Sequence, residues 1–94
     1  MKKYECTFII NPDKEEEADE LIDSITSFIK DENGKIEDID KWGPRKLAYQ
    51  IDGYKDGFYT VMNFDFDPGK VEIFKNFMQK DSNILRYIIV LKEG

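Results

Sequence analysis

Apolar and polar residues alternate in four segments of the chain, and apolar residues recur at helical spacing in two segments between them. The alternating segments cover residues 4–10, 36–51, 58–66 and 85–91, and each predicts a strand. Gly43-Pro44 interrupts the second strand and predicts a bend there, and a polar loop closing at Asp56-Gly57 is expected before the third.

The two helical segments carry recognisable start and stop signals. The first follows Asn11-Pro12, where Asp13 and Glu16 have the spacing of a capping box, and it ends at Asn33-Gly34, a pair typical of helix C-termini. The second begins at Asp67-Pro68, because aspartate is a favoured N-cap and proline suits the first helical position. The turn at residues 81–83 ends it.

The order strand, helix, strand, strand, helix, strand predicts one α+β domain over residues 1–94, with the ferredoxin-like split βαβ arrangement (βαββαβ). Right-handed crossovers place two helices on one face of a four-stranded antiparallel sheet, with the first and third strands central. The more apolar side of each strand is expected to face the helices: Tyr4, Cys6, Phe8, Ile10, Met62, Phe64, Phe66, Tyr87 and Ile89.

The opposite side of the sheet, called the open face below, has no helix to cover it. An uncovered face should be mostly polar, so its apolar residues suggest a surface for a partner protein. The alternative is that these residues are ordinary strand formers. Besides Ile9, the open face has four candidate partner-binding residues: Tyr59, Val61, Ile88 and Val90. Of these, Val61 and Ile88 are the best candidates and are expected to be exposed in the free monomer.

The net charge of −6 argues at first against nucleic acid, because a binder neutralises phosphates with Lys and Arg. The acidity, however, is concentrated: residues 13–40 contain 12 acidic and 3 basic side chains, and the rest of the chain 8 acidic and 11 basic. Much of it lies on the first helix, where a solvated face is a better interpretation than a metal site. The remaining surface can still present a basic patch.

Most catalytic and cofactor chemistry is unavailable to this composition. The chain has no histidine and a single cysteine, Cys6, which excludes the usual zinc sites, an internal disulfide and a His-activated nucleophile. No glycine-rich phosphate loop is present, so we expect a non-enzymatic binding module without cofactor or metal. No apolar run approaches the ~20 residues of a membrane span, and a soluble cytoplasmic protein is expected.

The run from Trp42 to Ile51 is the most informative motif. Arg45 and Lys46 follow the Gly-Pro bend, and Tyr49 comes three residues later, so phosphate contacts and base stacking are both possible. The alternative is a kinked edge strand whose cations deter pairing with another sheet.

Several segments together resemble the bacterial ribosomal protein S-six family across the whole chain. They are residues 1–5, Asn11-Pro12, the run 42–51, Gly57-Phe58-Tyr59 and residues 83–87, of which Gly43-x-Arg-Lys-Leu-Ala-Tyr-x-Ile51 is the most specific. The resemblance implies the ferredoxin-like fold and a structural role in the small ribosomal subunit. It also implies binding to small-subunit ribosomal RNA together with ribosomal protein S-eighteen.

Carried over by position, the resemblance implies RNA contacts at the basic motif, at the N-terminus and near the last strand. The candidate residues are Lys2, Lys3, Arg45, Lys46, Tyr49 and Arg86. We expect the isolated protein to be monomeric. The alternative function is a dimeric ferredoxin-like module that binds a small ligand or acts as an enzyme between two packed open faces.

Overall fold

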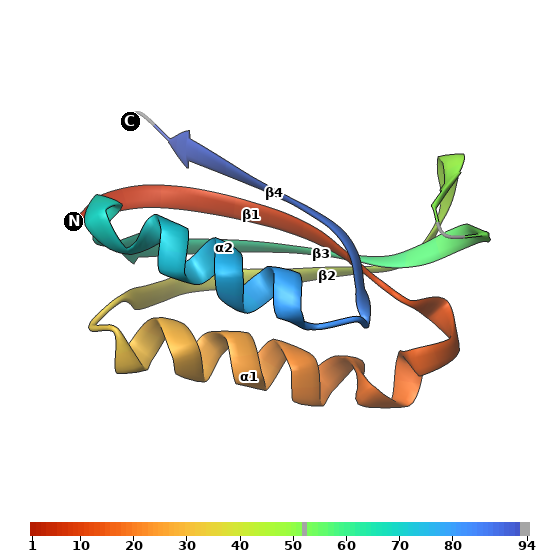
Figure 1. Ribbon diagram of the computed structural model, residues 1–94, viewed down its shortest axis with the longest axis horizontal. Helices are drawn as coiled ribbons and strands as arrows, with labels where there is room; N and C mark the ends of the chain where they lie inside the picture. Colours follow the sequence, from red (N-terminus) through yellow and green to blue (C-terminus); the bar gives the residue numbers. More distant parts are fainter. Residues whose placement is uncertain (52, 93–94) are drawn as a thin grey trace.

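The computed structural model describes residues 1–51 and 53–92, in which strands and helices follow the predicted order (Figure 1). The strands are β1 (Lys2–Ile10), β2 (Lys35–Ile51), β3 (Tyr54–Phe66) and β4 (Ile84–Lys92). The helices are α1 (Ala18–Asp31) and α2 (Val71–Lys80), each preceded by a short 3-10 segment, η1 (Pro12–Glu17) and η2 (Pro68–Lys70).

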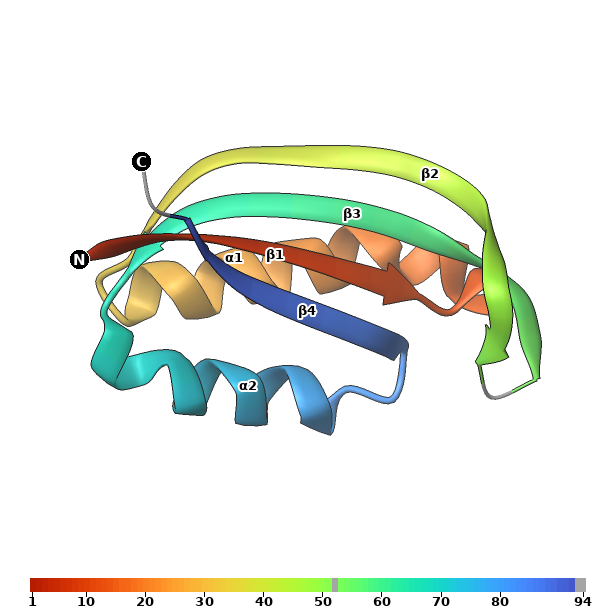
Figure 2. The ribbon, with the colours of Figure 1, turned by 90° about the horizontal axis from the view of Figure 1, so that it is seen from above.

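The strands form one antiparallel sheet in the order β2-β3-β1-β4, so the first and third strands are central as predicted. Both helices lie on the same side of this sheet, and the other side is uncovered (Figures 1 and 2). The structure therefore confirms the ferredoxin-like fold and the open face.

The hydrophobic core fills the space between the sheet and the two helices. Phe8 lies at the middle of β1 and is fully buried, as is Cys6 on the same side of the strand. Three phenylalanine rings from β3 and α2 pack with centroid distances of 5.3 to 5.9 Å: Phe64, Phe66 and Phe74. The alternation of the strands thus identified the core side correctly.

The start of the first helix differs from the prediction. The side chain of Asn11, not Asp13, accepts a hydrogen bond from a helical backbone N–H, at 2.9 Å from Asp13 N. A 3-10 segment follows, and Lys14 within it has the non-helical angles φ −115° and ψ 31°. The predicted capping box is wrong because Asn11, two residues before Asp13, is the cap, and the kink at Lys14 delays the α-helix to Ala18.

The other helix signals are confirmed. Asn33 has a φ of 66°, and Gly34 N donates to Ile29 O at 2.8 Å, which closes the C-terminus of α1 in the left-handed manner expected of this pair. Asp67 accepts from Gly69 N at 2.9 Å, so it caps the segment that leads into α2.

The second strand continues through the predicted bend. Its pairing with β3 shifts register three times, and Gly43 adopts a φ of +79°, a conformation that glycine reaches without steric cost. The loop expected to close at Asp56-Gly57 is wrong, because pairing continues past Gly57 as far as Ile51 and Tyr54. The result is a long hairpin arm (residues 45–51 and 53–57) that turns across the end of the sheet (Figure 2).

Candidate functional site

The hairpin arm packs on the open face through a glycine. Gly57 is buried, and a Cβ at this position would clash with Ile9 Cγ2 and lie 3.7 Å from Leu47 Cδ2. Only a residue without a side chain allows the arm to approach β1 this closely. The sequence therefore fixes the position at which the arm meets the sheet.

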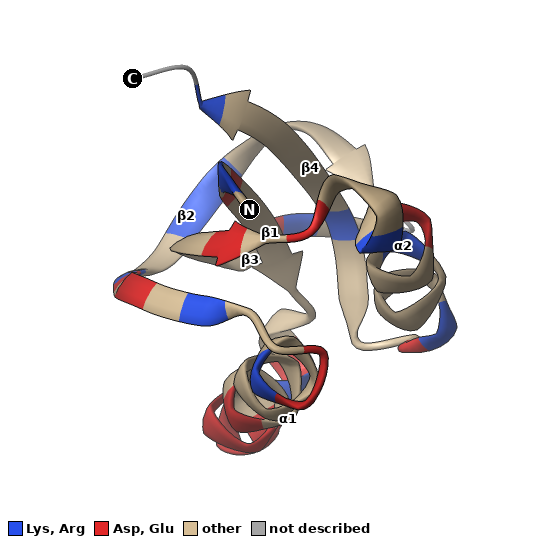
Figure 3. Ribbon diagram, turned by 90° about the vertical axis from the view of Figure 1, so that its left-hand side faces the viewer, with Lys and Arg blue, Asp and Glu red and all other residues tan. Residues whose placement is uncertain are grey.

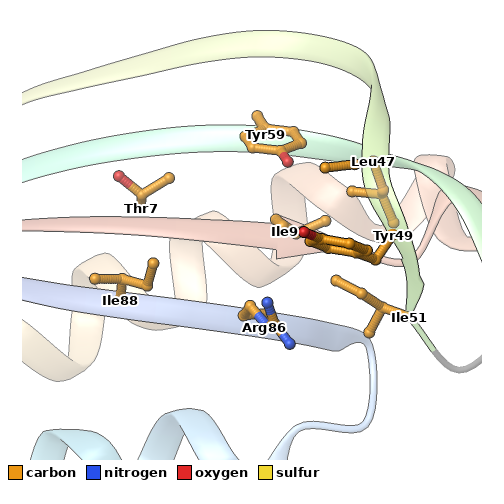
Figure 4. Close-up of a pocket in the computed structure, with 9 residues that line it drawn as sticks. Thr7, Ile9, Leu47, Tyr49, Ile51, Tyr59, Arg86 and Ile88 are labelled. Carbon is orange, nitrogen blue, oxygen red and sulfur yellow. The ribbon is translucent and has the colours of Figure 1, made fainter.

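Between the arm and the sheet lies a pocket of about 240 Å³, called the open-face pocket below (Figure 4). Strands β1 and β4 form one part of its lining, and the arm together with β3 forms the rest. The lining residues are Thr7, Ile9, Leu47, Ala48, Tyr49, Ile51, Tyr59, Arg86 and Ile88. Its walls are mostly apolar, and its polar side-chain groups are the guanidinium of Arg86, the phenols of Tyr49 and Tyr59, and the hydroxyl of Thr7.

The pocket brings together residues that the sequence assigned to two separate sites. Tyr49 and Arg86 come from the candidate RNA set, whereas Tyr59 and Ile88 come from the candidate partner set. They lie close together because the arm turns back over the sheet, as Figure 4 shows. Part of each candidate set therefore lies on one composite surface between the arm and the sheet.

An aromatic stack braces the base of the arm. Trp42 lies against Tyr59 with ring centroids 6.2 Å apart and ring planes at 8°, and Trp42 Nε1 donates to Asp40 Oδ2 at 2.9 Å. Sequence reasoning gave Trp42 no role. The available signal was its position directly before Gly43, where a large ring can fix the direction of the following strand.

Arg45 and Lys46 are exposed on the arm itself. They pair across the hairpin with Gly57 and Asp56, and Arg45 Nη1 donates to the carbonyl of Pro44 at 3.0 Å. Both side chains are available to solvent, as expected of groups that contact phosphate.

The N-terminal cations lie away from this surface. Lys3 and Ile9 are both on β1, about 20 Å apart at ~3.3 Å per residue. Lys2 points to the helix side of the sheet, since it pairs with Phe66, whereas Lys3 is on the open face.

Lys3 is held by two carboxylates. Its ammonium donates to Glu37 and, at 3.5 Å, to Asp65. The hydrogen bond to Glu37, and then the charge of Asp65, raise the pKa of Lys3. Lys3 therefore keeps its positive charge, and two carboxylates of the protein itself lie beside it.

The partner-binding candidates differ in exposure. Ile88 is 56% exposed, as expected, and Val90 49%, but Val61 is only 8% exposed. The expectation that Val61 is free on the open face is wrong, because this residue of a central strand lies between Thr7 on β1 and Asp40 on β2. Ile9 is buried for a related reason, since the hairpin arm covers it.

The remaining surface offers little other chemistry. Acidic residues gather on α1, below the sheet (Figure 3), and no group of three His, Cys, Asp or Glu side chains within residues 1–51 and 53–92 could hold a metal ion. In the same part of the chain, no helix is long and apolar enough to cross a membrane.

The thiol of Cys6 lies in the core. Cys6 is buried, and burial raises the pKa of its thiol to about 12.

Comparisons with known proteins agree with this architecture. A family model described as "Ribosomal protein S6" matches residues 3–91. The chain is 36% identical over 94 residues to small ribosomal subunit protein bS6 of Fusobacterium nucleatum, covering 99% of this chain and 100% of that protein. It is 31% identical to bS6 of Heliobacterium modesticaldum, covering 99% and 98%.

A solved structure is also similar. The crystal structure of 30S ribosomal protein S6 from Thermotoga maritima superimposes with a TM-score of 0.91 at 32% sequence identity. The alignment covers 97% of this chain and 87% of that one.

Proposed function

The chain belongs to the ribosomal protein S6 family, and from this premise we propose that it binds small-subunit ribosomal RNA together with ribosomal protein S-eighteen. It is a non-enzymatic, structural protein of the small ribosomal subunit and acts in the cytoplasm. The proposal concerns the partners and the residues that contact them.

The observation that carries the proposal is the composite surface at the hairpin arm. Arg45 and Lys46 supply exposed cations on the arm, and the adjacent pocket combines Tyr49 and Arg86 with apolar residues. Cations next to an exposed aromatic ring suit an RNA backbone with an unpaired base. The apolar part, with Ile88 at its edge, suits contact with a protein.

The charge of the chain supports a shared RNA site. A protein of net charge −6 gains little from the phosphate backbone on its own. A basic partner seated on the open face would supply the missing cations, and the two chains together would bind more tightly than either alone. The acidic face of α1 lies on the other side of the sheet, away from this joint surface.

The test is RNA binding with and without the partner. We expect the isolated chain to bind a small-subunit RNA fragment weakly, and an equimolar mixture with ribosomal protein S-eighteen to bind it tightly and to co-sediment with small ribosomal subunits. Equal RNA affinity with and without S-eighteen would contradict the shared site.

The alternative, a dimeric ligand-binding module or enzyme, predicts a different behaviour in solution. Gel filtration of the isolated chain would then give a stable dimer with its open faces packed together. Membership of the ribosomal protein S6 family argues against an enzyme. The proposed function instead expects a monomer in solution, whose open face is available to bind a different protein.

A further inference from the structure

The two edges of the sheet are protected to different degrees. An edge strand exposes unpaired backbone N–H and C=O groups, and proteins usually guard such edges with charges, prolines or bulges. The β2 edge has all three: exposed Glu37 and Asp38, Pro44, and three register shifts. Pairing by a further strand is therefore obstructed along β2.

The β4 edge is open by comparison. Over the residues that the structure describes, β4 is the terminal strand and pairs with β1 alone. Its nine residues contain neither glycine nor proline, and Arg86 is the only charged residue before Lys92. Such a strand is suited to accept another strand beside it.

Apolar side chains are exposed on both sides of β4. Ile88 and Val90 lie on the open face, opposite Thr7 and Glu5. Leu91 is 42% exposed on the helix side, since it pairs with the core residue Tyr4. A protein lying only on the open face would cover Ile88 and Val90 and leave Leu91 in water. A strand added at the edge covers all three.

We propose that the outer edge of β4 binds an extended segment of the partner protein, which adds a fifth strand to the sheet. This inference rests on the proposed function, because the edge is continuous with the surface assigned to that partner. The segment carries apolar side chains at alternate positions, packing against Ile88 and Val90 on one side and Leu91 on the other. Backbone hydrogen bonds to β4 provide the remaining contacts.

Charge favours a foreign segment over a second copy of this chain. Two copies would each bring a net charge of −6, whereas the basic partner inferred above is attracted. A homodimer through this edge is therefore the competing outcome that the experiment must separate.

The first measurement compares two aspartate variants for binding to purified ribosomal protein S-eighteen. Leu91→Asp should weaken binding by about tenfold or more, because it puts a charge where the added strand packs. The matched control, Ile73→Asp, replaces a similarly exposed residue (48%) on α2 and should change the affinity by less than about twofold. Thermal melts of both variants verify that they fold.

The second measurement uses the unmodified chain, so that it does not depend on a variant folding. Amide hydrogen exchange in the free protein should be fast at every second residue of β4, and these amides should become protected on adding S-eighteen. If Leu91→Asp bound S-eighteen with wild-type affinity, or if the β4 amides stayed unprotected in the complex, the proposal of an added strand would be overturned. The proposed function would remain intact. A dimer with protected β4 amides before any partner is added would also overturn it. Failure of the unmodified chain to bind S-eighteen at all would overturn both proposals.

Discussion

Trp42 stacks on Tyr59 with nearly parallel rings, 8° apart, at the point where the hairpin arm leaves the sheet. Trp42 is 45% exposed, so the stack contributes to the surface as well as to stability. Tyr59 also lines the open-face pocket. The contact that sets the direction of the arm therefore also sets part of the shape of the pocket. The stacking of Trp42 on Tyr59 therefore helps to shape the surface that we propose binds RNA and protein.

Replacing Trp42 by alanine should loosen the arm without unfolding the domain. The lost stacking should reduce the free energy of unfolding by about 0.5–1.5 kcal/mol, in addition to the loss of buried apolar area. RNA binding in the presence of S-eighteen should weaken too, because Arg45 and Lys46 follow Trp42 on the arm. Tyr49→Ala is the control for stability, since Tyr49 is 81% exposed and its removal should leave urea melts nearly unchanged. Melts and RNA affinity of Trp42→Ala that match the wild type would show that the stack does not brace the arm.

Phe8→Ala should be severely destabilising. Phe8 is fully buried at the centre of β1, and removing a buried phenylalanine costs ~3–5 kcal/mol out of the ~5–15 kcal/mol that stabilises a small domain. Urea denaturation measures the loss, with Ile73→Ala on the exposed side of α2 as the control. A loss below about 1 kcal/mol for Phe8→Ala would be inconsistent with its position in the core.

The Cys6 thiol should be unreactive in the folded protein and should destabilise it at alkaline pH. Burial raises its pKa from 9.0 to about 12, so above pH 9 the unfolded chain loses a proton that the folded chain retains. Unfolding is then favoured increasingly between pH 9 and 12, and stability falls as the pH rises. Cys6→Ala should show a flatter stability profile over this range in urea melts, and a thiol reagent at pH 8 should label the wild type only after unfolding. Rapid labelling under native conditions would contradict the buried position.

The sequence predicted the fold well because its signals are local. Alternation alone assigned Phe8 and Cys6 to the core side, and the Asp67-Pro68 pair marked the correct start of the second helical segment. The start of α1 was missed because two side chains, Asn11 and Asp13, compete for the same capping role. The spacing of apolar residues does not show which of two neighbouring polar side chains is the N-cap.

The site was only partly predictable because it depends on long-range geometry. Tyr49 and Arg86 were both identified from the sequence, but their meeting in one pocket requires the register shifts of β2 and the close approach at Gly57. The burial of Val61 likewise depends on its neighbouring strands, and its own alternation pattern does not reveal it. A pattern gives the face on which a residue lies but not how much of it is covered.

Reversing the charge of Arg45 and Lys46 together should weaken RNA binding and leave the fold intact. Both side chains are exposed, so melts of the double glutamate variant should match the wild type. Each lost phosphate contact should reduce the slope of log affinity against log salt by ~0.7–0.9, measured with S-eighteen present. The matched control reverses Lys14 and Lys30 on the acidic helical side, which changes the net charge equally, and should keep the wild-type slope. An equal loss of slope in the two double variants would mean that net charge alone is responsible.

Glutamate at Ile88 and at Val61 should have different effects, although both residues lie on the open face. Ile88 is 56% exposed, so Ile88→Glu should keep the melting temperature of the free protein and abolish tight binding of S-eighteen, because a charge enters an apolar contact. Val61 is 8% exposed, so Val61→Glu should lower the melting temperature by burying a carboxylate between neighbouring strands. Thermal melts and partner titrations on the two variants measure this difference. If Ile88→Glu bound S-eighteen with wild-type affinity, the open face would not be the partner surface; if Val61→Glu melted like the wild type, the packing around Val61 described above would be wrong.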